Sequence, residues 1–566
     1  MSFTILQTMT TQGPTQATRE HMIKTRDGFH LATDIYIPTG HEPDTKYSAI
    51  LSRTCYDKSS DYTGLKFEAE SFNARGYVFV AQDVRGKFRS TGTTVPYEHD
   101  VDDAYDTVDW IIAQPWSNAK VGLVGASYYG FTVWAGVACG HPAVKAAIPQ
   151  VTGVDMAQSH VAPRVNFEIP FHGALSDILQ IWTNNKGYLA EIDYQKPAAE
   201  IIADAEKTIG ISKAAQKFLK HTQHMAWYNP YGDRHPYHTT SIPILHWQGW
   251  YDPGLCPLGM RDWRYFQRQP SMTGLHYLRV ASEDHSTFRL EDVGKGRDFH
   301  SYFNKDVVRR KQAFDHQEMA DFFDEHLNGI EPAKPRARAR WHVGHLGWQE
   351  THHFPPKTEA KVFHLTQGSE KGIHRLDEQG TKDSSVLTWT HDPENPVPST
   401  HDIESIWFLL LSYPDERDQA GRPDVLVFRT EVLPSDLVLV GQPVLSVQLT
   451  YPAQSTHLFL KLQDVYPDGT TRPISWSSVV LRKTQREQIK ITLDDNAYRF
   501  KKGHRIQLHM AASNFPYAVP HPGTDENPWT ATRKVKAEHL LLVGGNKGAI
   551  LELPTIDIST LSVSEP

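Results

Sequence analysis

The stretch VGLVGASYYGFTVWAG, from Val121 to Gly136, sets a single serine between small residues and a pair of tyrosines. An apolar run typical of a buried strand precedes Ser127, and a segment of helical character follows it. Gly125 and Gly130 flank the serine in the pattern G-x-S-x-x-G. Small neighbours are needed where a strand turns sharply into a helix, because that turn strains the backbone. The pattern therefore predicts a strand, a tight turn at Ser127 and a helix.

The predicted turn would make Ser127 a nucleophile. A sharp strand-to-helix turn lifts the serine hydroxyl above the sheet and directs the first N–H groups of the helix at the reacting carbonyl. The second glycine stands one residue later than in the common G-x-S-x-G pattern of this nucleophile elbow. From these residues alone, an ordinary tight turn is the alternative.

A serine nucleophile requires a base, and the base requires a carboxylate that orients it. Two later stretches supply candidates in the order Ser, Asp, His. Asp252 follows the apolar strand pattern at 242–250, and His285 follows the one at 275–282. Catalytic groups in open α/β sheets gather at the carboxyl ends of strands, so we expect these side chains to meet at one edge. Asp284, next to the histidine, is the alternative acid.

The segments around Ser127 alternate between strand and helix patterns. Asp27-Gly28, between two extended runs, predicts a hairpin. Further patterns predict strands and helices in turn, with strands at 47–56, 76–86, 120–126 and 143–153 and helices at 98–114 and 127–141. This alternation is typical of a parallel α/β sheet.

The remaining chain changes character three times. Helical patterns replace strands at 154–240, the α/β pattern resumes at 241–335, and short alternating runs separated by turn residues dominate 336–566. We therefore predict an α/β domain formed by residues 1–153 and 241–335, with a helical cap inserted at 154–240. Residues 336–566 are predicted to form a C-terminal jelly-roll β-sandwich.

The composition argues against several classes of protein. The formal net charge is −8 and no basic block occurs, so we expect binding neither to nucleic acid nor to a membrane surface. The 3 cysteines form no CxxC pair, and the 30 histidines are scattered, so neither a disulfide framework nor a metal site is expected. No apolar run is long enough to span a bilayer, and the amino terminus lacks the pattern of a secretory signal. A cytoplasmic location is the expectation.

Taken together, these stretches resemble the CocE/NonD family of cocaine-esterase-like acyl hydrolases, which are related to X-prolyl dipeptidyl aminopeptidases and α-amino acid ester hydrolases. The resemblance covers nearly the whole chain. It rests on segments such as RDGFHLATDIYIP, YVFVAQDVRGKFRSTG, QPWSNAKVGLVGASYYG, GWYD and GHRIQLHMAASNFPYAVPHPGT. It implies an α/β-hydrolase domain with a helical cap, followed by a jelly-roll domain.

The resemblance also implies roles for individual residues. Ser127 matches the nucleophile, Asp252 the acid and His285 the base of a catalytic triad. Tyr56 matches the tyrosine whose hydroxyl forms half of the oxyanion hole, and the backbone N–H of Tyr128 matches the other half. A phenol suits this task because it is a neutral hydrogen-bond donor at pH 7.

The residues that would shape the substrate pocket are less well defined. Trp250, Trp407 and Phe408 are candidates to line it, and packing in a core is the alternative for each. The cap and the region at 392–411 both depart from the pattern of the relatives. The identity of the substrate therefore does not carry over from them.

The predicted activity is hydrolysis of an ester, or of an amide, in a small-molecule acyl substrate through an acyl-enzyme, with no cofactor. One rival is an acyltransferase that uses the same triad with an alcohol or amine acceptor. Another is an X-Pro dipeptidyl aminopeptidase. It would need a carboxylate for the substrate's amino group, for which Glu168, Asp177 and Glu283 are candidates, with solvated surface charges as the alternative. A third is a binding protein with an inactive hydrolase domain. The resemblance leaves a homodimer open.

Overall fold

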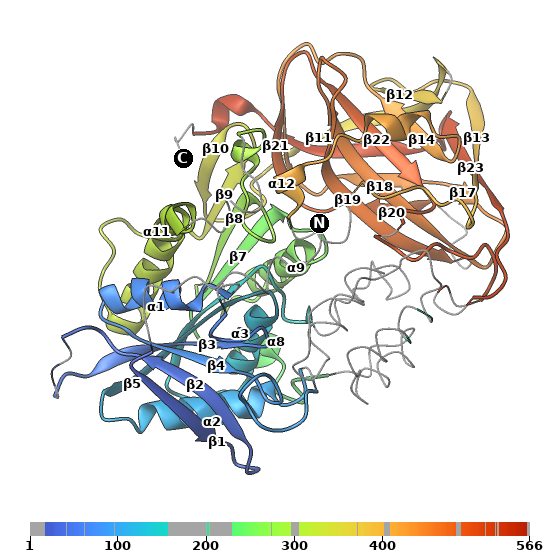
Figure 1. Cartoon of the computed structure of the whole chain (residues 1–566). Helices are drawn as coiled ribbons and strands as arrows, with labels where there is room; N and C mark the ends of the chain where they lie inside the picture. The colour runs from blue at the N-terminus through green and yellow to red at the C-terminus, as the bar shows by residue number, and fades with distance from the viewer. Residues whose placement is uncertain are drawn as a thin grey trace.

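The computed structural model shows two domains, one built on a mixed α/β sheet and one rich in β-strands (Figure 1). It describes residues 17–562 apart from 41, 43, 61–62, 96, 157–199, 201–202, 204–228, 273, 296–304, 371, 401–407, 483–487, 516, 527 and 529–530. The side chains of 305–313 and 370 are also outside the description. In the described part of the chain, no helix combines the length and apolar character needed to cross a membrane.

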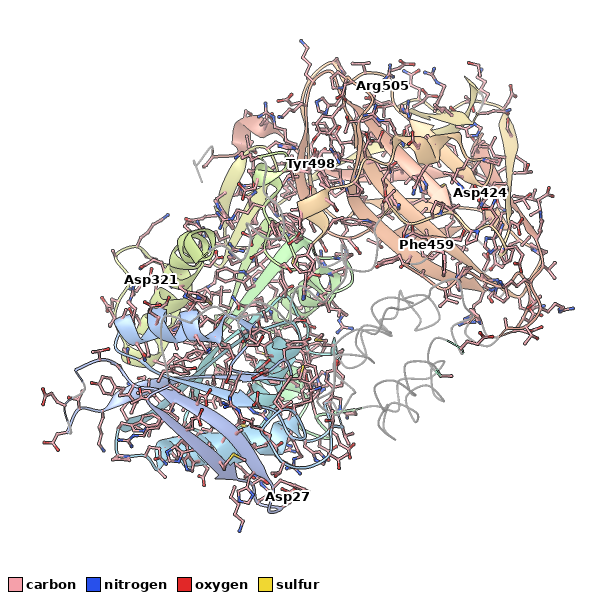
Figure 2. The ribbon with its side chains drawn as sticks, viewed as in Figure 1. Asp27, Asp321, Asp424, Phe459, Tyr498 and Arg505 are labelled. Carbon is pink, nitrogen blue, oxygen red and sulfur yellow. The ribbon has the colours of Figure 1, made fainter. Side chains whose placement is uncertain are left out.

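The first domain is organised around a ten-stranded sheet with the order β1-β2-β4-β3-β5-β6-β7-β8-β9-β10. Its strands are β1 (Arg19–Lys24), β2 (His30–Tyr36), β3 (Tyr47–Thr54), β4 (Val78–Asp83), β5 (Ser117–Ala126), β6 (Val144–Gln150), β7 (Ile244–Tyr251), β8 (His276–Asp284), β9 (Ala339–Val343) and β10 (Gly347–Thr351). The strands from β4 through β3 and β5 to β9 pair in parallel, whereas β1, β2 and β10 pair antiparallel to their neighbours. The predicted hairpin is the β1–β2 pair, and Figure 2 labels Asp27 at its tip.

Helices cover both faces of this sheet, which explains why its central strands are buried along their length. All residues of β4 and β7 are buried, as expected for parallel strands between two helical layers. One apolar cluster lies beneath α2, α3 and α9, and a second lies beneath α1 and α11 (Figure 1). The helices are α1 (Leu65–Ala74), α2 (Asp100–Ile112), α3 (Ser127–Ala138), α8 (Pro236–Thr239), α9 (Cys256–Gln267) and α11 (Lys305–Phe323).

The sheet extends further along the chain than the sequence predicted. The second part of the α/β domain was expected to end at residue 335, yet β9 pairs in parallel with β8, and β10 folds back on β9. Both strands therefore belong to the first sheet, which ends at Thr351. The reason is that β9 covers the edge of β8, whose backbone N–H and C=O groups would otherwise be unpaired.

Most of the cap predicted at 154–240 lies outside the described residues, so its helices stay a prediction. The two ends of this insertion are described, and they meet beside α9. Asp262 accepts a hydrogen bond from the backbone N–H of Val154 at 2.7 Å, and the Tyr231 hydroxyl donates to the carbonyl of Val154 at 2.5 Å. The insertion therefore leaves and rejoins the domain at one place.

The second domain contains two β-sheets. The larger consists of β11 (Glu359–Glu370), β12 (Ile373–Asp377), β14 (Val425–Arg429), β15 (Leu437–Gly441), β16 (Val444–Val447), β18 (Ser455–Val465), β19 (Thr471–Arg482), β20 (Ile489–Thr492), β21 (Asn496–Phe500), β22 (Arg505–Ala511) and β24 (Ile550–Ile556). The smaller consists of β13 (Ser384–His391), β17 (Leu449–Thr450) and β23 (Ala537–Gly544). A short helix, α12 (Leu409–Ser412), lies between β13 and β14 in the chain. The C-terminal domain is thus β-rich, as the sequence predicted.

The two domains share one apolar core. The side chains of Trp250 on β7 and Trp341 on β9 belong to the same cluster as Leu365 on β11 and the core of the β-rich domain. A backbone bridge also joins Gly344 to Tyr498, which Figure 2 labels at the junction. The β-rich domain is therefore packed directly on the part of the sheet that carries β7, β8 and β9.

Four buried histidines lie close together inside the β-rich domain. His391 Nε2 is 2.7 Å from the carbonyl oxygen of His521, and the ring centroids of His457 and His521 are 4.9 Å apart. His539 Nε2 lies 2.7 Å from the Thr456 hydroxyl. Burial holds the pKa of His521 and of His539 at about 4, and it also lowers the pKa of His391 and of His457. The cluster is therefore uncharged at neutral pH.

The cluster should make the protein less stable in mild acid. Because burial lowers these pKa values below the ordinary 6.5, the unfolded chain binds protons that the folded chain excludes, and stability falls between about pH 6.5 and pH 4. Buried Glu68 and Asp83, whose pKa values burial raises to about 8 and about 7, act in the opposite direction. We therefore expect His457→Phe to reduce the loss of unfolding free energy between pH 7 and pH 5. Denaturant titrations at both pH values measure it, with exposed His352→Phe as control. An unchanged pH slope in His457→Phe would contradict it.

Candidate functional site

Ser127 occupies the predicted turn between β5 and α3. β5 ends at Ala126, and α3 begins at Ser127 itself. The φ angle of Ser127 is +58°, a left-handed backbone conformation that a residue with a side chain adopts only at an energetic cost. A strained serine at a strand-to-helix turn is the geometry of a nucleophile elbow. The sequence therefore predicted this local structure correctly.

The two flanking glycines are required by close approaches of the backbone. A Cβ atom on Gly125 would lie 2.3 Å from the carbonyl oxygen of Tyr129. A Cβ atom on Gly130 would lie 2.7 Å from the Thr152 side chain and 2.8 Å from the carbonyl oxygen of Gln150. Gly130 thus permits α3 to pack against the end of β6. This contact explains why residue 130 is a glycine.

Asp252 and His285 lie together at the carboxyl ends of adjacent strands. In the parallel pair β7–β8, Tyr251 is the register partner of Asp284, so the next residues, Asp252 and His285, leave the two strands at the same level. His285 Nδ1 is 2.9 Å from Asp252 Oδ2. Asp252 is 1% exposed, and this burial raises the pKa of its carboxyl while the histidine lowers it. The buried carboxylate can therefore hold the imidazole in one orientation.

The strand order brings the serine to the same edge as this pair. β5, β6, β7 and β8 are consecutive and parallel, so their carboxyl ends share one side of the sheet. Ser127 follows β5, Asp252 follows β7 and His285 follows β8. The order of these elements is that of the α/β-hydrolase fold, in which a Ser-Asp-His triad is assembled at this edge.

The neighbouring acids Asp284 and Glu283 are engaged elsewhere. Asp284 is fully buried and accepts hydrogen bonds from backbone N–H groups, among them that of Ser286 at 3.0 Å. Glu283 is 2% exposed and forms ion pairs with Arg279 at 2.8 Å and Arg289 at 3.1 Å. The expectation of a solvated charge at Glu283 is wrong, because this carboxylate is buried and paired with two arginines. Glu168 and Asp177 lie outside the described residues.

Tyr56 lies beside the elbow. Its ring contacts the ring of Tyr129 edge-on, with 6.1 Å between the centroids. Its backbone N–H donates to the Thr54 hydroxyl at 3.1 Å, and the Asp83 carboxylate accepts a hydrogen bond from the backbone N–H of Lys58 at 2.8 Å. These bonds fix the loop that follows β3. A fixed loop gives the Tyr56 hydroxyl the defined position that an oxyanion donor needs.

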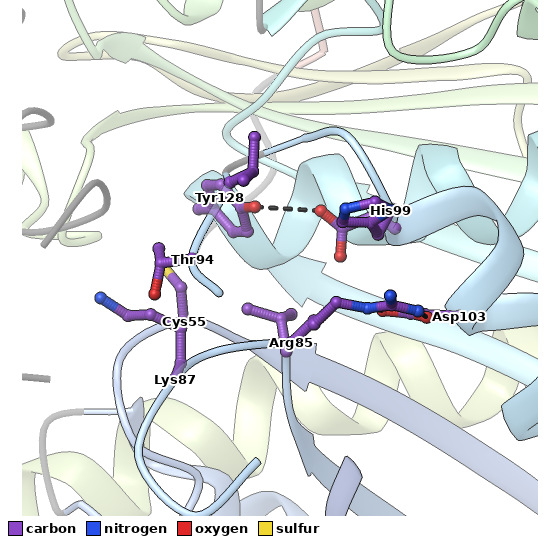
Figure 3. Close-up of a pocket in the computed structure, with 10 residues that line it drawn as sticks. Cys55, Arg85, Lys87, Thr94, His99, Asp103 and Tyr128 are labelled. Atoms are coloured by element: carbon purple, nitrogen blue, oxygen red, sulfur yellow. Dashed lines mark hydrogen bonds and ion pairs between the residues drawn. The ribbon is translucent and has the colours of Figure 1, made fainter. Parts of the chain in front are cut away.

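Tyr128 is anchored by its hydroxyl, which the sequence did not predict. The phenol donates to Asp100 Oδ2 at 3.0 Å and accepts from the backbone N–H of Tyr97 at 3.1 Å. Asp100 in turn faces the buried guanidinium of Arg53 at 3.3 Å. Figure 3 draws the hydrogen bond from the Tyr128 hydroxyl to Asp100, and in this view Tyr128 lines a pocket behind the first turn of α3. The backbone N–H of Tyr128 is among the first four of α3, which have no partner within the helix.

The pocket in Figure 3 supports the site but is not the substrate pocket. Its volume is about 260 Å³, counting the part open to solvent, and its walls include neither Ser127 nor His285. Its lining is strongly charged and includes Arg85, Lys87, Asp100 and Asp103. Arg85 forms ion pairs with Asp103 and Asp27, and these bonds fix the loop between β4 and α2. Cys55, also in the lining, is buried and outside any disulfide.

The three residues proposed to line the substrate pocket have different locations. Trp250 is 1% exposed, packs 5.3 Å from Phe354 between ring centroids and donates its indole N–H to the carbonyl of His342 at 2.8 Å. This location makes it part of the shared core. Phe408 is half-buried near Phe288, three residues beyond His285, with 6.3 Å between the ring centroids. Trp407 lies outside the described residues.

The described residues offer no obvious place for a metal ion. Within them, no three His, Cys, Asp or Glu side chains are grouped so as to hold one. The polar groups at the carboxyl edge of the sheet include an alcohol, an imidazole and a carboxylate, together with backbone N–H groups. This set can perform nucleophilic and general acid–base chemistry.

The anchor of Tyr128 gives a prediction about stability. Tyr128→Phe removes the hydroxyl that serves buried Asp100 and the backbone of Tyr97, so we expect a loss of about 1–3 kcal/mol in unfolding free energy. Denaturant unfolding measures it. Tyr451→Phe is the control, because the hydroxyl of buried Tyr451 has no hydrogen-bond partner among the described residues. Equal losses in the two variants would show that the anchor contributes nothing.

Comparison with known proteins places the chain in a family. The model of the X-Pro dipeptidyl-peptidase S15 family matches residues 27–285, and that of the X-Pro dipeptidyl-peptidase C-terminal non-catalytic domain matches residues 328–551. The chain is 27% identical over 556 residues to a cocaine esterase from Rhodococcus sp.. The alignment covers 88% of this chain and 90% of that relative.

Solved structures share the fold over nearly the full length. An α-amino acid ester hydrolase has a TM-score of 0.78 at 23% identity, with 98% of this chain and 100% of that chain covered. An aminopeptidase from a marine sediment Thaumarchaeota archaeon has a TM-score of 0.78 at 22% identity, with 97% and 98% covered. A CocE/NonD family hydrolase from Staphylococcus aureus has a TM-score of 0.64 at 18% identity, with 95% and 93% covered. With its α/β-hydrolase domain followed by a β-rich domain, the chain belongs to the CocE/NonD family of serine hydrolases.

Proposed function

We propose that the protein is a carboxylic ester hydrolase that acts on small-molecule esters through Ser127, His285 and Asp252. The observation that carries the proposal is the strained backbone of Ser127 at the start of α3, on the same sheet edge as the Asp252–His285 pair. A serine in that conformation costs stability, and such strain is found where function requires it. The full-length similarity to a cocaine esterase supports an ester as the substrate.

In the proposed reaction, His285 acts as the base. Its Nδ1–H donates to Asp252, which leaves the unprotonated Nε2 to take the proton of Ser127. The Ser127 oxygen then forms a bond to the carbonyl carbon of the ester. When the tetrahedral intermediate collapses, the bond to the leaving alkoxide breaks and His285 returns its proton to that oxygen. Water, deprotonated by His285, releases the acid from Ser127 by the reverse steps.

Two neutral donors are proposed to stabilise the oxyanion of the intermediate. The backbone N–H of Tyr128 is at the N-terminus of α3, where the helix dipole favours negative charge. The Tyr56 hydroxyl is the second donor, because Tyr56 is buried against the elbow through its contact with Tyr129. Neither donor brings a full charge into the site, so each gains strength only as the oxyanion develops.

The surroundings of Glu283 favour an ester without a free amino group over an aminopeptidase substrate. A substrate ammonium group would need an acidic partner near the site. Glu283, one of the three candidates from the sequence, is already neutralised by Arg279 and Arg289. We therefore propose that the enzyme does not cleave Xaa-Pro-anilides. Release of dipeptides from such a substrate would favour the peptidase instead.

Replacement of the nucleophile gives the central prediction. Ser127→Ala should abolish hydrolysis of a p-nitrophenyl ester and labelling by a fluorophosphonate, because the proposed acyl-enzyme forms on the Ser127 oxygen. Thermal unfolding should show that the variant remains folded. Wild-type turnover in this variant would refute the proposed function. If labelling occurs but a competing alcohol captures the acyl group before water does, the enzyme is an acyltransferase.

Removal of one oxyanion donor should lower turnover without weakening binding. Tyr56→Phe keeps the ring that contacts Tyr129 and removes only the hydroxyl. We expect kcat to fall by about 10²–10³-fold, the usual cost of one oxyanion-hole donor, with KM nearly unchanged. Steady-state kinetics on the p-nitrophenyl ester measure both. Tyr47→Phe, at the start of β3, is the matched control. A rise in KM at constant kcat would instead assign Tyr56 to ground-state binding.

A further inference from the structure

The loop that carries His285 is organised around a single buried carboxylate. Asp284, the last residue of β8, is 0% exposed. Its Oδ1 accepts hydrogen bonds from the backbone N–H groups of Ser286 at 3.0 Å and Phe288 at 2.9 Å. Its own backbone also closes the turn, since the N–H of Asp284 donates to the Phe288 carbonyl at 3.0 Å and the N–H of Thr287 donates to the Asp284 carbonyl at 2.9 Å. His285 lies inside this closed turn.

The second oxygen of Asp284 reaches into the other domain. Oδ2 accepts a hydrogen bond at 2.9 Å from the backbone N–H of Leu410, a residue of α12 that is 126 positions away in the chain. Leu410 is at the second position of this short helix, where a backbone N–H has no partner within the helix. The ring of Phe408, just before α12, contacts that of Phe288 in the histidine loop. The β-rich domain therefore touches the loop through a polar bond and an apolar contact.

A carboxylate is the one side chain that satisfies all of these donors together. Asp284 receives three backbone N–H groups on two oxygens, and each bond is strengthened by the negative charge. The turn also contains Thr287 at a φ of +62°, a conformation that needs support from its surroundings. Loss of the carboxylate would leave buried N–H groups without an acceptor, and the turn would lose the group that holds it to α12.

We propose that Asp284 is a positioning residue for His285, through which α12 of the β-rich domain holds the catalytic loop against Asp252. This inference rests on the proposed function, because it assumes that His285 is the base. It assigns Asp284 no contact with the substrate. The domain matched as non-catalytic would then contribute to turnover by fixing where the imidazole lies.

The test uses Asp284→Asn in the full-length enzyme. Asparagine has nearly the same shape but only one acceptor oxygen. Either the N–H of Leu410, or the N–H groups of Ser286 and Phe288, would therefore face the NH₂ group of the asparagine. Asp436→Asn is the matched control. Asp436 accepts the backbone N–H of Lys502 at 2.8 Å and a hydrogen bond from Arg499, but these groups lie within the β-rich domain.

We expect Asp284→Asn to lower kcat by about 10- to 100-fold while KM stays near the wild-type value, since displacement of a catalytic group by about 1 Å has effects of this size. The acid limb of the kcat/KM profile should move to lower pH, because an imidazolium held less firmly against Asp252 is less stabilised. The rate of fluorophosphonate labelling at Ser127 should fall with kcat. Asp436→Asn should leave all three at wild-type values.

The outcomes separate this inference from the proposed function. If Ser127→Ala is inactive and Asp284→Asn matches Asp436→Asn in kcat and pH profile, Asp284 does not position His285 and the inference is overturned. If Ser127→Ala retains activity, the proposed function itself is wrong, whatever the kinetics of Asp284→Asn. Should Asp284→Asn be too unstable to purify, Leu410→Pro decides the question by comparison with Leu410→Ala, because both lose the buried leucine side chain but only the proline also lacks the interdomain N–H. Leu410→Pro is expected to lose more kcat than Leu410→Ala. Equal kcat in these two variants would overturn the inference.

Discussion

Parallel pairing of β5, β6, β7 and β8 is the constraint on which the candidate site depends. Residues that are 125 and 158 positions beyond Ser127 in the chain, Asp252 and His285, reach its side of the sheet because parallel strands all end at one edge. The register of β7 against β8 then places the acid and the imidazole at the same level. A shift of one residue between these two strands would turn the side chains to opposite faces and separate them.

Buried ion pairs lie behind the nucleophile elbow and restrain it. Arg53 and Arg85 face Asp100 and Asp103 beneath the first turn of α3, and Asp100 holds the Tyr128 hydroxyl. Charges in the interior are costly unless they are paired, and each of these charges has a partner of opposite sign. Here this network fixes the residue that follows the strained serine. The strain at Ser127 is thus supported by a rigid polar layer on one side and by close packing at the two glycines on the other.

The sequence predicted those features that short-range chemistry determines. The hairpin at Asp27, the strand and helix on either side of Ser127 and most strands of the β-rich domain follow from residue patterns within a few positions. The positions of Asp252 and His285 at strand ends were predictable for the same reason. The bond from Leu410 to Asp284 was not, because it joins residues 126 positions apart and uses a backbone N–H that has no sequence signal. The role of Asp100 was not predictable either, because an acidic residue in the first turn of a helix already suits the helix dipole and the sequence does not show that Asp100 is buried. The continuation of the first sheet into β9 and β10 was not predicted, because an edge that needs covering is a property of the whole sheet.

The core shared by the two domains has a consequence for how this architecture can change over evolution. Trp250, Trp341 and Phe354 fill the space between the sheet and the β-rich domain, and their neighbours come from both. Domains joined by a flexible linker can be gained, lost or exchanged as units, but an interdigitated apolar boundary forces both partners to vary in concert. The substrate range of such an enzyme is therefore freer to diverge in peripheral loops than by replacement of its C-terminal half.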